Sequence, residues 1–261
     1  MNLKNQNTDM NPASSKTPNL IDQYRRHFVG GSVAAVAGLA LAPGLILQSV
    51  QAKPVDQAVS SKNRWGLLID TTKCSDGCND CVTACNTEHG LREIHGPATD
   101  AQWIRTVKLK NKSTGHTLNL PMMCQHCENP PCVDVCPTGA SFKREDGIVL
   151  VDKHICIGCR YCMMACPYKA RSFIHETLTD QLPVAPRGKG TVESCTMCVT
   201  RVDNGGIPAC VEACTAENHN AMIFGDLNNP NSNISVELKK HGGKQLRPDL
   251  ALNTGVRYQN L

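Results

Sequence analysis

The cysteines of this chain constrain its fold more than any other feature, because all sixteen stand in four short clusters. Each cluster holds four cysteines, and we call the clusters the first to fourth quartets. In chain order they read Cys74-x3-Cys78-x2-Cys81-x3-Cys85, Cys124-x2-Cys127-x4-Cys132-x3-Cys136, Cys156-x2-Cys159-x2-Cys162-x3-Cys166 and Cys195-x2-Cys198-x11-Cys210-x3-Cys214. A hydrophobic core does not need four thiols within eleven residues, as in the third quartet. The quartets therefore predict a bound group.

The third quartet carries the most specific pattern. Together with Pro167 it matches the run C-x2-C-x2-C-x3-C-P, which binds iron–sulfur clusters in bacterial ferredoxins. Its two-residue spacers supply the tight loop from which three thiolates can converge on three irons of a cubane. The fourth cysteine of the run ligates the other cluster of a pair, and we expect it to begin a short helix together with the proline. The second quartet also ends in Cys-Pro.

Zinc sites and disulfides are the alternative interpretations of so much cysteine. A zinc ribbon separates two cysteine pairs by a long spacer, and only the fourth quartet, with its eleven-residue gap, has that form. Disulfides staple small exported domains that lack a core, whereas 261 residues are enough to build one. Disulfides would also have to join neighbouring loop thiols to distant ones in register. The spacing favours iron–sulfur clusters.

Short apolar runs precede two of the quartets and predict strands. "WGLLID" stands before the first quartet and "GIVLVD" before the third. Strand, aspartate, cysteine loop and short helix form the repeating half-module of a ferredoxin, and two halves make a two-cluster domain. Four halves predict an α+β fold of two ferredoxin-like modules. Between the first two quartets, Trp103 to Lys110, a turn and "HTLNL" predict a β-hairpin insertion that covers a cluster or contacts a partner.

Residues 1–52 carry the features of an export signal. Arg25 and Arg26 precede an uncharged apolar run from Val29 to Leu47, and Ala52 is a small residue of the kind found at signal-peptidase sites. The paired arginines resemble the twin-arginine class, whose substrates fold and take up cofactors before export. An uncleaved membrane anchor is the alternative, since the run is near the lower length for a span. The sequence thus predicts a periplasmic protein.

Other kinds of function find little support in the sequence. The net charge is +4, and residues 1–52 account for half of it with four basic and two acidic residues, so no basic patch for nucleic acid is expected. We find no nucleophile triad, phosphate loop or dinucleotide fingerprint, and hence no catalytic residue. His126 lies inside the second quartet, where we expect it to donate to a sulfur rather than to ligate iron.

Taken together, the motifs resemble the four-cluster ferredoxin-like electron-transfer subunits of membrane oxidoreductases. This family includes the DMSO reductase and formate dehydrogenase beta subunits and the NrfC proteins. The matching stretches are "CQHCENPPCVDVCPTGA", "GIVLVDKHICIGCRYCMMACPYKAR" and "CTMCVTRVDNGGIPACVEAC", within about residues 64–230. "KCSDGCNDCVTACNTEHGL" and the leader are most similar to members from dissimilatory sulfur metabolism. The x3 spacer after Cys74 departs from the x2 that is common in the wider family.

The resemblance implies how the quartets combine. The first quartet would pair with the fourth, in a module of residues 64–123 and 190–230, and the second with the third, in a module of residues 124–189. Residues 231–261 would form a polar C-terminal tail along the surface. Four [4Fe–4S] clusters are implied, with these ligands: Cys74, Cys78, Cys81 and Cys214 for cluster 1; Cys195, Cys198, Cys210 and Cys85 for cluster 2; Cys124, Cys127, Cys132 and Cys166 for cluster 3; Cys156, Cys159, Cys162 and Cys136 for cluster 4.

The resemblance also implies electron transfer rather than catalysis. Each iron would be held by protein thiolates and would keep no open position for a substrate, unlike a catalytic metal. The implied partners are an NrfD-like, quinone-reactive membrane subunit and a periplasmic c-type cytochrome, with the chain peripheral to the membrane. The alternatives are the beta subunit of a periplasmic molybdopterin oxidoreductase and a free periplasmic ferredoxin. We expect the hairpin Trp103 to Leu120 and the tail beyond Asn228 to serve as docking surfaces.

Overall fold

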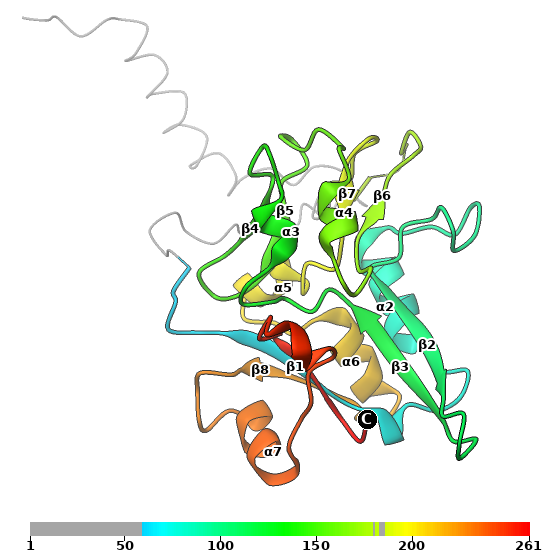
Figure 1. Ribbon diagram of the computed structural model, residues 1–261, viewed down its shortest axis with the longest axis vertical. Coiled ribbons are helices and arrows are strands. Elements are labelled where there is room, and N and C mark those ends of the chain that lie inside the picture. Colours follow the sequence, from blue (N-terminus) through cyan, green and yellow to red (C-terminus); the bar gives the residue numbers. More distant parts are fainter. Residues whose placement is uncertain (1–58, 180, 183–185) are drawn as a thin grey trace, which may run out of the picture. The chain divides into compact units, whose positions relative to one another are not determined.

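The structure is a computed structural model, and it describes residues 59–179, 181–182 and 186–261 (Figure 1). The predicted export segment lies outside these residues. The strands are β1 (Trp65–Asp70), β2 (Ile104–Lys110), β3 (Thr117–Met123), β4 (Ser141–Lys143), β5 (Val149–Val151), β6 (Ser172–Phe173), β7 (Val192–Glu193), β8 (Met222–Asp226) and β9 (Val256–Gln259). The helices are α2 (Asp80–His89), α3 (Pro131–Asp134), α4 (Tyr161–Ala165), α5 (Val199–Asp203), α6 (Ala209–Ala216) and α7 (Asn233–His241). Mixed helices and strands confirm the predicted α+β class.

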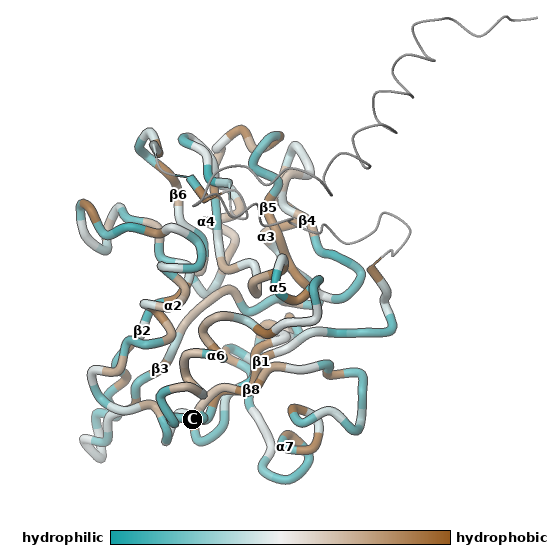
Figure 2. Tube along the Cα trace, turned by 180° about the vertical axis from the view of Figure 1, so that it is seen from behind, coloured by the Kyte–Doolittle hydropathy of each residue, from teal (hydrophilic) through white to brown (hydrophobic). Residues whose placement is uncertain are grey.

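The sheet β8-β1-β9 forms the base of the molecule, with β1 antiparallel to β8 and parallel to β9. Strand β1 is buried on both faces, which explains why its sequence is a continuous apolar run. Leu67 and Ile69 belong to the core that also contains the cysteines of α2 and α6. Leu68 is equally buried and lies near Gly243, on the side covered by α7. Figure 2 shows the apolar colouring that follows β1, β8 and α6 through the centre of the molecule.

The second and third quartets form a separate lobe above this sheet (Figure 1). Strands β4 and β5 form an antiparallel hairpin, which stands between α3 and α4 in the chain. Helix α3 packs against α4, and α2 packs against α6. The lobe that contains α3 and α4 is therefore inserted in the chain between the two halves, β1–α2 and α6–β8, of the other. We call the lobe with α2 and α6 the first module and the lobe with α3 and α4 the second.

The position of the short helices differs from the prediction that the fourth cysteine of a quartet begins a helix. Cys136 and Cys166 follow α3 and α4, while Cys85 and Cys214 lie inside α2 and α6. Each helix begins before the fourth cysteine and carries the chain from one group of thiols to the next. Proline cannot continue a helix, which fits the place of Pro167 just beyond α4.

The predicted β-hairpin is confirmed. Strand β2 pairs antiparallel with β3, from Ile104 opposite Met123 to Lys110 opposite Thr117. The turn is held by Asn111, whose side chain accepts from the main-chain N–H groups of Ser113 and Thr114. The base of the hairpin is buried and its tip is exposed. The hairpin is therefore anchored in the core of the first module.

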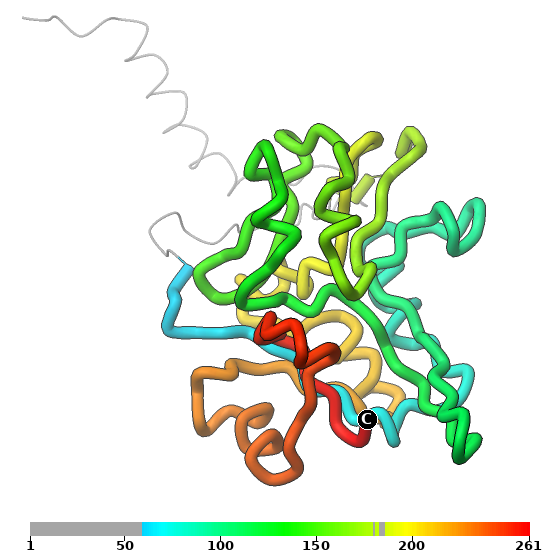
Figure 3. Tube along the Cα trace, in the orientation of Figure 1, coloured from blue at the N-terminus to red at the C-terminus, as the bar shows by residue number. Residues whose placement is uncertain are grey.

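The C-terminal segment does not run along the surface as predicted. Strand β9 joins the central sheet beside β1, and Figure 3 shows the red end of the chain against the cyan strand. Val256 and Tyr258 are fully buried. The Tyr258 hydroxyl donates to the carbonyl of Pro121 at 2.9 Å and accepts from Gln125 Nε2 at 3.1 Å. A four-residue strand with alternating buried apolar side chains was hidden in a polar sequence.

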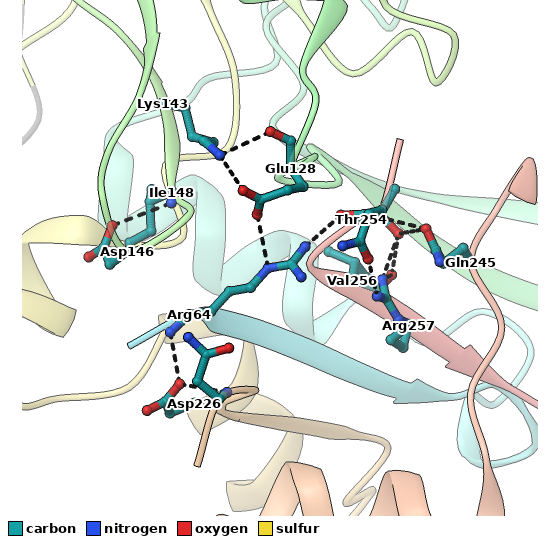
Figure 4. Close-up of polar contacts among 12 residues, drawn as sticks. Arg64, Glu128, Lys143, Asp146, Ile148, Asp226, Gln245, Thr254, Val256 and Arg257 are labelled. Atoms are coloured by element: carbon teal, nitrogen blue, oxygen red, sulfur yellow. Dashed lines mark hydrogen bonds and ion pairs between the residues drawn. The ribbon is translucent and has the colours of Figure 1, made fainter. Parts of the chain in front are cut away.

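Arg64, directly before β1, links the two modules (Figure 4). Its main-chain N–H donates to Asp226 of β8 at 2.8 Å. Its guanidinium lies 3.3 Å from a carboxylate oxygen of Glu128 and donates to the carbonyl of Asn253 at 2.6 Å. The other oxygen of Glu128 pairs with Lys143 of β4 at 2.5 Å. The central sheet, the second module and the C-terminal segment are thereby held in one arrangement, which fixes the spacing of the quartets.

Candidate iron–sulfur centres

The cysteines predicted for cluster 1 surround one cavity of about 370 Å³ between α2, α6 and the base of the hairpin β2–β3. Its lining includes all four of the predicted ligands, which come from two quartets: Cys74, Cys78, Cys81 and Cys214. Burial raises the pKa of Cys81 to about 12, with further contributions from the other three thiolates. Thiolates so close together repel one another and require cations between them. The cavity and its donor set fit an iron–sulfur cluster.

The cysteines predicted for cluster 2 are gathered between α2 and the fourth quartet. Burial raises the pKa of the Cys85 thiol, and the thiolates of Cys210 and Cys198 raise it further. Main-chain N–H groups donate to two sulfurs: Met197 to Cys195 at 3.4 Å and Ala209 to Cys198 at 3.4 Å. Met197 and Cys198 both have left-handed backbone angles, which curl the loop around this group.

The cysteines predicted for cluster 3 line a second cavity, of about 320 Å³, in the second module. The four predicted ligands in its lining are Cys124, Cys127, Cys132 and Cys166. Burial raises the pKa of Cys127 to about 12, with further contributions from the other three thiolates. The lining also contains Arg171. The donor set again consists of three cysteines from one quartet and the last cysteine of another.

The cysteines predicted for cluster 4 lie at the upper surface of the second module. Burial raises the pKa of Cys162, Arg171 opposes that rise, and the thiolates of Cys156 and Cys136 add to it. The loop has a tight turn at Gly158, which has φ +69°, and a Cβ there would lie 2.2 Å from the carbonyl oxygen of Gly190. Only glycine fits this position of the third quartet.

The four groups form a series through the molecule. Cys81 and Cys85 stand one turn apart on α2 and belong to the first and second groups. Burial raises the pKa of Cys195, then its own partners Cys85 and Cys210 do so, and Cys124 of the third group adds to the effect. Cys132 of the third group is influenced in the same way by Cys162 of the fourth. Neighbouring groups are thus close enough to interact electrostatically.

All sixteen cysteines lie within the described residues and all are free thiols, which excludes a disulfide framework in this structure. Their exposure differs along the series. Cys159 is exposed, whereas the others are buried or partly buried. The fourth group therefore has one edge at the surface.

Three side chains near the sulfurs differ from or add to the sequence-based picture. His126 is buried, but its Nδ1 accepts from the N–H of Val149 at 3.0 Å, and its Nε2 has no hydrogen-bond partner in the described part of the chain. The predicted donation from its side chain to a sulfur is not seen, because the start of β5 engages the ring; its main-chain N–H bonds to Cys124 instead. His89 and Arg171, which sequence reasoning missed, do contact cysteines.

His89 Nε2 lies 3.3 Å from Cys198 Sγ, and its ring packs against Trp103 with centroids 4.3 Å apart. Burial and the nearby cations Lys153 and Arg201 lower the pKa of His89 to about 4, so the ring is neutral at pH 7. At the other end of the series, Asp80 and His219 form a 2.8 Å pair beside Cys78. No periodic pattern in the sequence marks either histidine.

Comparison with known proteins places this geometry in a family. Two segments, residues 73–140 and 116–227, match family models described as "4Fe-4S dicluster domain". The chain is 40% identical to the Hdr-like menaquinol oxidoreductase iron-sulfur subunit 1 of Archaeoglobus fulgidus, over 91% of this chain and 98% of the relative. It is 36% identical to the B component of tetrathionate reductase from Salmonella typhimurium, over 92% and 90%. It is 35% identical to protein NrfC of Escherichia coli, over 88% and 91%.

The chain belongs to the iron–sulfur electron-transfer subunits of membrane-linked oxidoreductase complexes. The family resemblance drawn from the sequence is confirmed at this level. As a member of this family it carries [4Fe–4S] clusters in two dicluster, ferredoxin-like domains. Bound to thiolates, such clusters supply one-electron chemistry, and the surrounding residues set their potentials through charge, hydrogen bonds and burial. In the part of the chain that the structure describes, no helix is long and apolar enough to span a membrane.

Proposed function

We propose that the chain carries four [4Fe–4S] clusters, one in each group of four cysteines described above. The observation that carries this proposal is the grouping itself. Each group combines three cysteines of one quartet with the last cysteine of its partner quartet, and two groups line cavities. The packing of α2 on α6 and of α3 on α4 supports the same ligand exchange. The expected iron content of the anaerobically purified protein is about sixteen per chain.

The arrangement of the groups supports a relay of single electrons. Each group neighbours the next, so an electron can enter at one end of the series and leave at the other. All ligands are protein thiolates, which leaves no open iron for a substrate. The protein would therefore transfer electrons for a complex without catalysing the reaction itself.

The third-quartet loop is the place where we expect one partner to dock. Around the exposed Cys159 stand large apolar side chains that are themselves exposed: Ile155, Ile157, Tyr161 and Met164. Arg160 and Lys169 are exposed as well, and residues 153–169 contain no acidic residue. The two docking surfaces expected from the sequence are weaker candidates, because β9 is buried in the sheet and the hairpin base covers the cavity of cluster 1.

We infer that the protein passes electrons between a quinone-linked, NrfD-like membrane subunit and a periplasmic c-type cytochrome in dissimilatory sulfur metabolism. In this role it would resemble DsrO, the periplasmic iron–sulfur subunit of the DsrMKJOP complex. The relative from Archaeoglobus fulgidus supports the quinone link, since it is named as part of a menaquinol oxidoreductase. The paired arginines at Arg25 and Arg26 support export by the twin-arginine route and a place at the periplasmic side of the membrane.

A second candidate function is that of beta subunit in a periplasmic molybdopterin oxidoreductase. The relatives from tetrathionate reductase and sulfite dehydrogenase favour it, because each is named as a subunit of an enzyme for a sulfur compound. A free periplasmic ferredoxin is the third possibility. The identity of the partners distinguishes all three.

Affinity purification of the tagged chain from its own cells, after gentle detergent extraction, tests the proposal. We expect a multi-span membrane protein and a c-type cytochrome in the eluate, identified by mass spectrometry and haem staining. Recovery with a large molybdopterin subunit would establish the second function, and a soluble monomer would establish the third. Iron near four per chain, or stoichiometric zinc, would refute the proposed clusters whatever the partners.

A further inference from the structure

Arg171 is a buried cation in the second module, five residues after the last cysteine of the third quartet. Its side chain is only 6% exposed. One guanidinium nitrogen, Nη2, donates to Cys132 Sγ at 3.0 Å and to the Ser141 hydroxyl at 2.7 Å. The other, Nη1, is buried and has no hydrogen-bond partner among the described residues. The guanidinium also lies beside Cys162, whose thiolate it stabilises.

No carboxylate of the described residues neutralises this arginine. Arg144 and Arg187 have side chains that are also largely buried, and each pairs with an aspartate or a glutamate, but Arg171 forms no such pair. Burial of an uncompensated cation costs several kcal/mol. The negative charge that compensates Arg171 must therefore come from the thiolates around it, which belong to two different groups: Cys132 to cluster 3 and Cys162 to cluster 4.

The position of Arg171 follows from the internal repeat of the module. Ser141 stands five residues after Cys136, and Arg171 stands five residues after Cys166. Each directly begins or precedes a strand, β4 or β6. The 2.7 Å bond between their side chains joins equivalent positions of the two halves. One arginine at this meeting point can reach sulfurs from both halves.

The first module has a different side chain against its sulfurs. His89 contacts Cys198 there, and it is neutral at pH 7 because burial lowers its pKa to about 4. The equivalent of Arg171, five residues after Cys214, is His219, which is partly exposed and paired with Asp80. A buried, uncompensated cation against the cysteine sulfurs is thus a feature of the second module in the described structure.

We propose, on the basis of the four clusters and ligand sets proposed above, that Arg171 is a cation shared by clusters 3 and 4 and raises the reduction potential of both. A cluster becomes more negative when it accepts an electron. A positive charge and N–H donors at its sulfurs stabilise that reduced form more than the oxidised form. The low-dielectric surroundings of a buried guanidinium strengthen the effect. Arg171 acts through the sulfurs and is a positioning and tuning residue.

Reductive titration of the anaerobically purified, full-length protein, followed by EPR spectroscopy, tests this role. Arg171→Gln removes the charge but keeps a hydrogen-bond donor. We expect two of four potentials to fall, with the reduction equilibrium of each cluster shifted at least about tenfold, equivalent to about 59 mV for one electron. Arg105→Gln is the matched control, because Arg105 donates to the carbonyls of Lys169 and Tyr168 beside the same loop and is more exposed. The control should leave all four potentials unchanged.

Arg171→Lys separates the shared role from a simple structural one. Lysine keeps the charge, but its single, shorter ammonium cannot reach both groups, so at least one of the two potentials should fall. Unchanged potentials in Arg171→Gln at full iron content, or a shift confined to one cluster, would overturn the proposal. If Arg171→Gln fails to assemble, unchanged potentials in Arg171→Lys overturn it. A wild-type iron content below sixteen would count against the four-cluster function itself and not against Arg171 in particular.

Discussion

At the scale of single residues, the cysteines are buried at a cost that only a bound cation can offset. Burial raises the pKa of the thiols at Cys74, Cys81, Cys124 and Cys127 to about 11 or 12, well above the ordinary value for cysteine. Without metal these groups would remain protonated at neutral pH. With iron they become thiolates, so cluster binding and folding of the chain are coupled. The apoprotein should therefore be much less stable than the loaded protein.

The exchange of the fourth cysteine between quartets gives a prediction for two single residues. Cys136→Ser should weaken or remove the cluster built on Cys156, Cys159 and Cys162, with iron falling toward about twelve per chain if that cluster is lost. Cys166→Ser is the reciprocal variant and should affect the cluster built on Cys124, Cys127 and Cys132. EPR spectra and iron analysis of both proteins check the assignment. If each serine instead damages the cluster of its own quartet, the proposed ligand exchange is wrong.

At the scale of elements, local patterns could be predicted from the sequence and contacts between distant segments could not. The apolar runs of β1 and β5 and the alternating hairpin β2–β3 were visible because strand periodicity is a local signal. Strand β9 was missed, since "VRYQ" is short and half polar and its partner β1 stands almost two hundred residues earlier. The ligand sets follow from cysteine spacing and family resemblance. Arg171 and His89 are single residues in no repeating pattern, and only the fold brings them to the sulfurs.

The cysteine loops contain glycines that differ in how much space they have. Gly158→Ala should strongly destabilise the third-quartet loop, because its Cβ would lie 2.2 Å from a main-chain oxygen and its backbone is left-handed. Gly77 of the first-quartet loop also has positive φ, +81°, but no atom lies within 4 Å of its Cβ position. Gly77→Ala should therefore cost only about 1–2 kcal/mol from the backbone. Thermal unfolding and loss of cluster absorbance compare the two variants; equal effects would contradict the steric argument.

Strand β9 gives a prediction about the C-terminal segment. Tyr258→Ala should lower the free energy of unfolding by about 3–5 kcal/mol, because a large side chain with no exposure leaves a cavity in the core. Tyr258→Phe keeps the ring and removes only the hydroxyl between Pro121 and Gln125, for about 1–3 kcal/mol. Denaturant unfolding of the anaerobic protein measures both. A Tyr258→Ala variant as stable as wild type would mean that β9 is not required by the sheet.

At the scale of the whole molecule, each cluster site depends on segments far apart in the chain. The first module is complete only when the last part of the sequence has returned to β1, and the second module is inserted between its halves. Iron cannot occupy all four sites until nearly the entire chain has been made. Sulfide and iron are supplied inside the cell, so the protein has to fold around its clusters before it leaves. This requirement agrees with a transport route that accepts folded proteins.

The export prediction follows from this order of events. Changing both Arg25 and Arg26 to Lys keeps the charge but removes the guanidinium pair that the twin-arginine resemblance implicates. We expect the variant to accumulate in the cytoplasm with its clusters already inserted, and the brown cytoplasmic fraction should contain about sixteen irons per chain. Changing Lys4 and Lys16 to Arg is the matched control, since it exchanges two basic residues outside the pair at constant charge, and export should continue. Cell fractionation with immunoblotting measures both outcomes. Normal periplasmic levels of the double-lysine variant would show that another route carries the protein, and a cytoplasmic product without iron would show that the clusters are inserted after export.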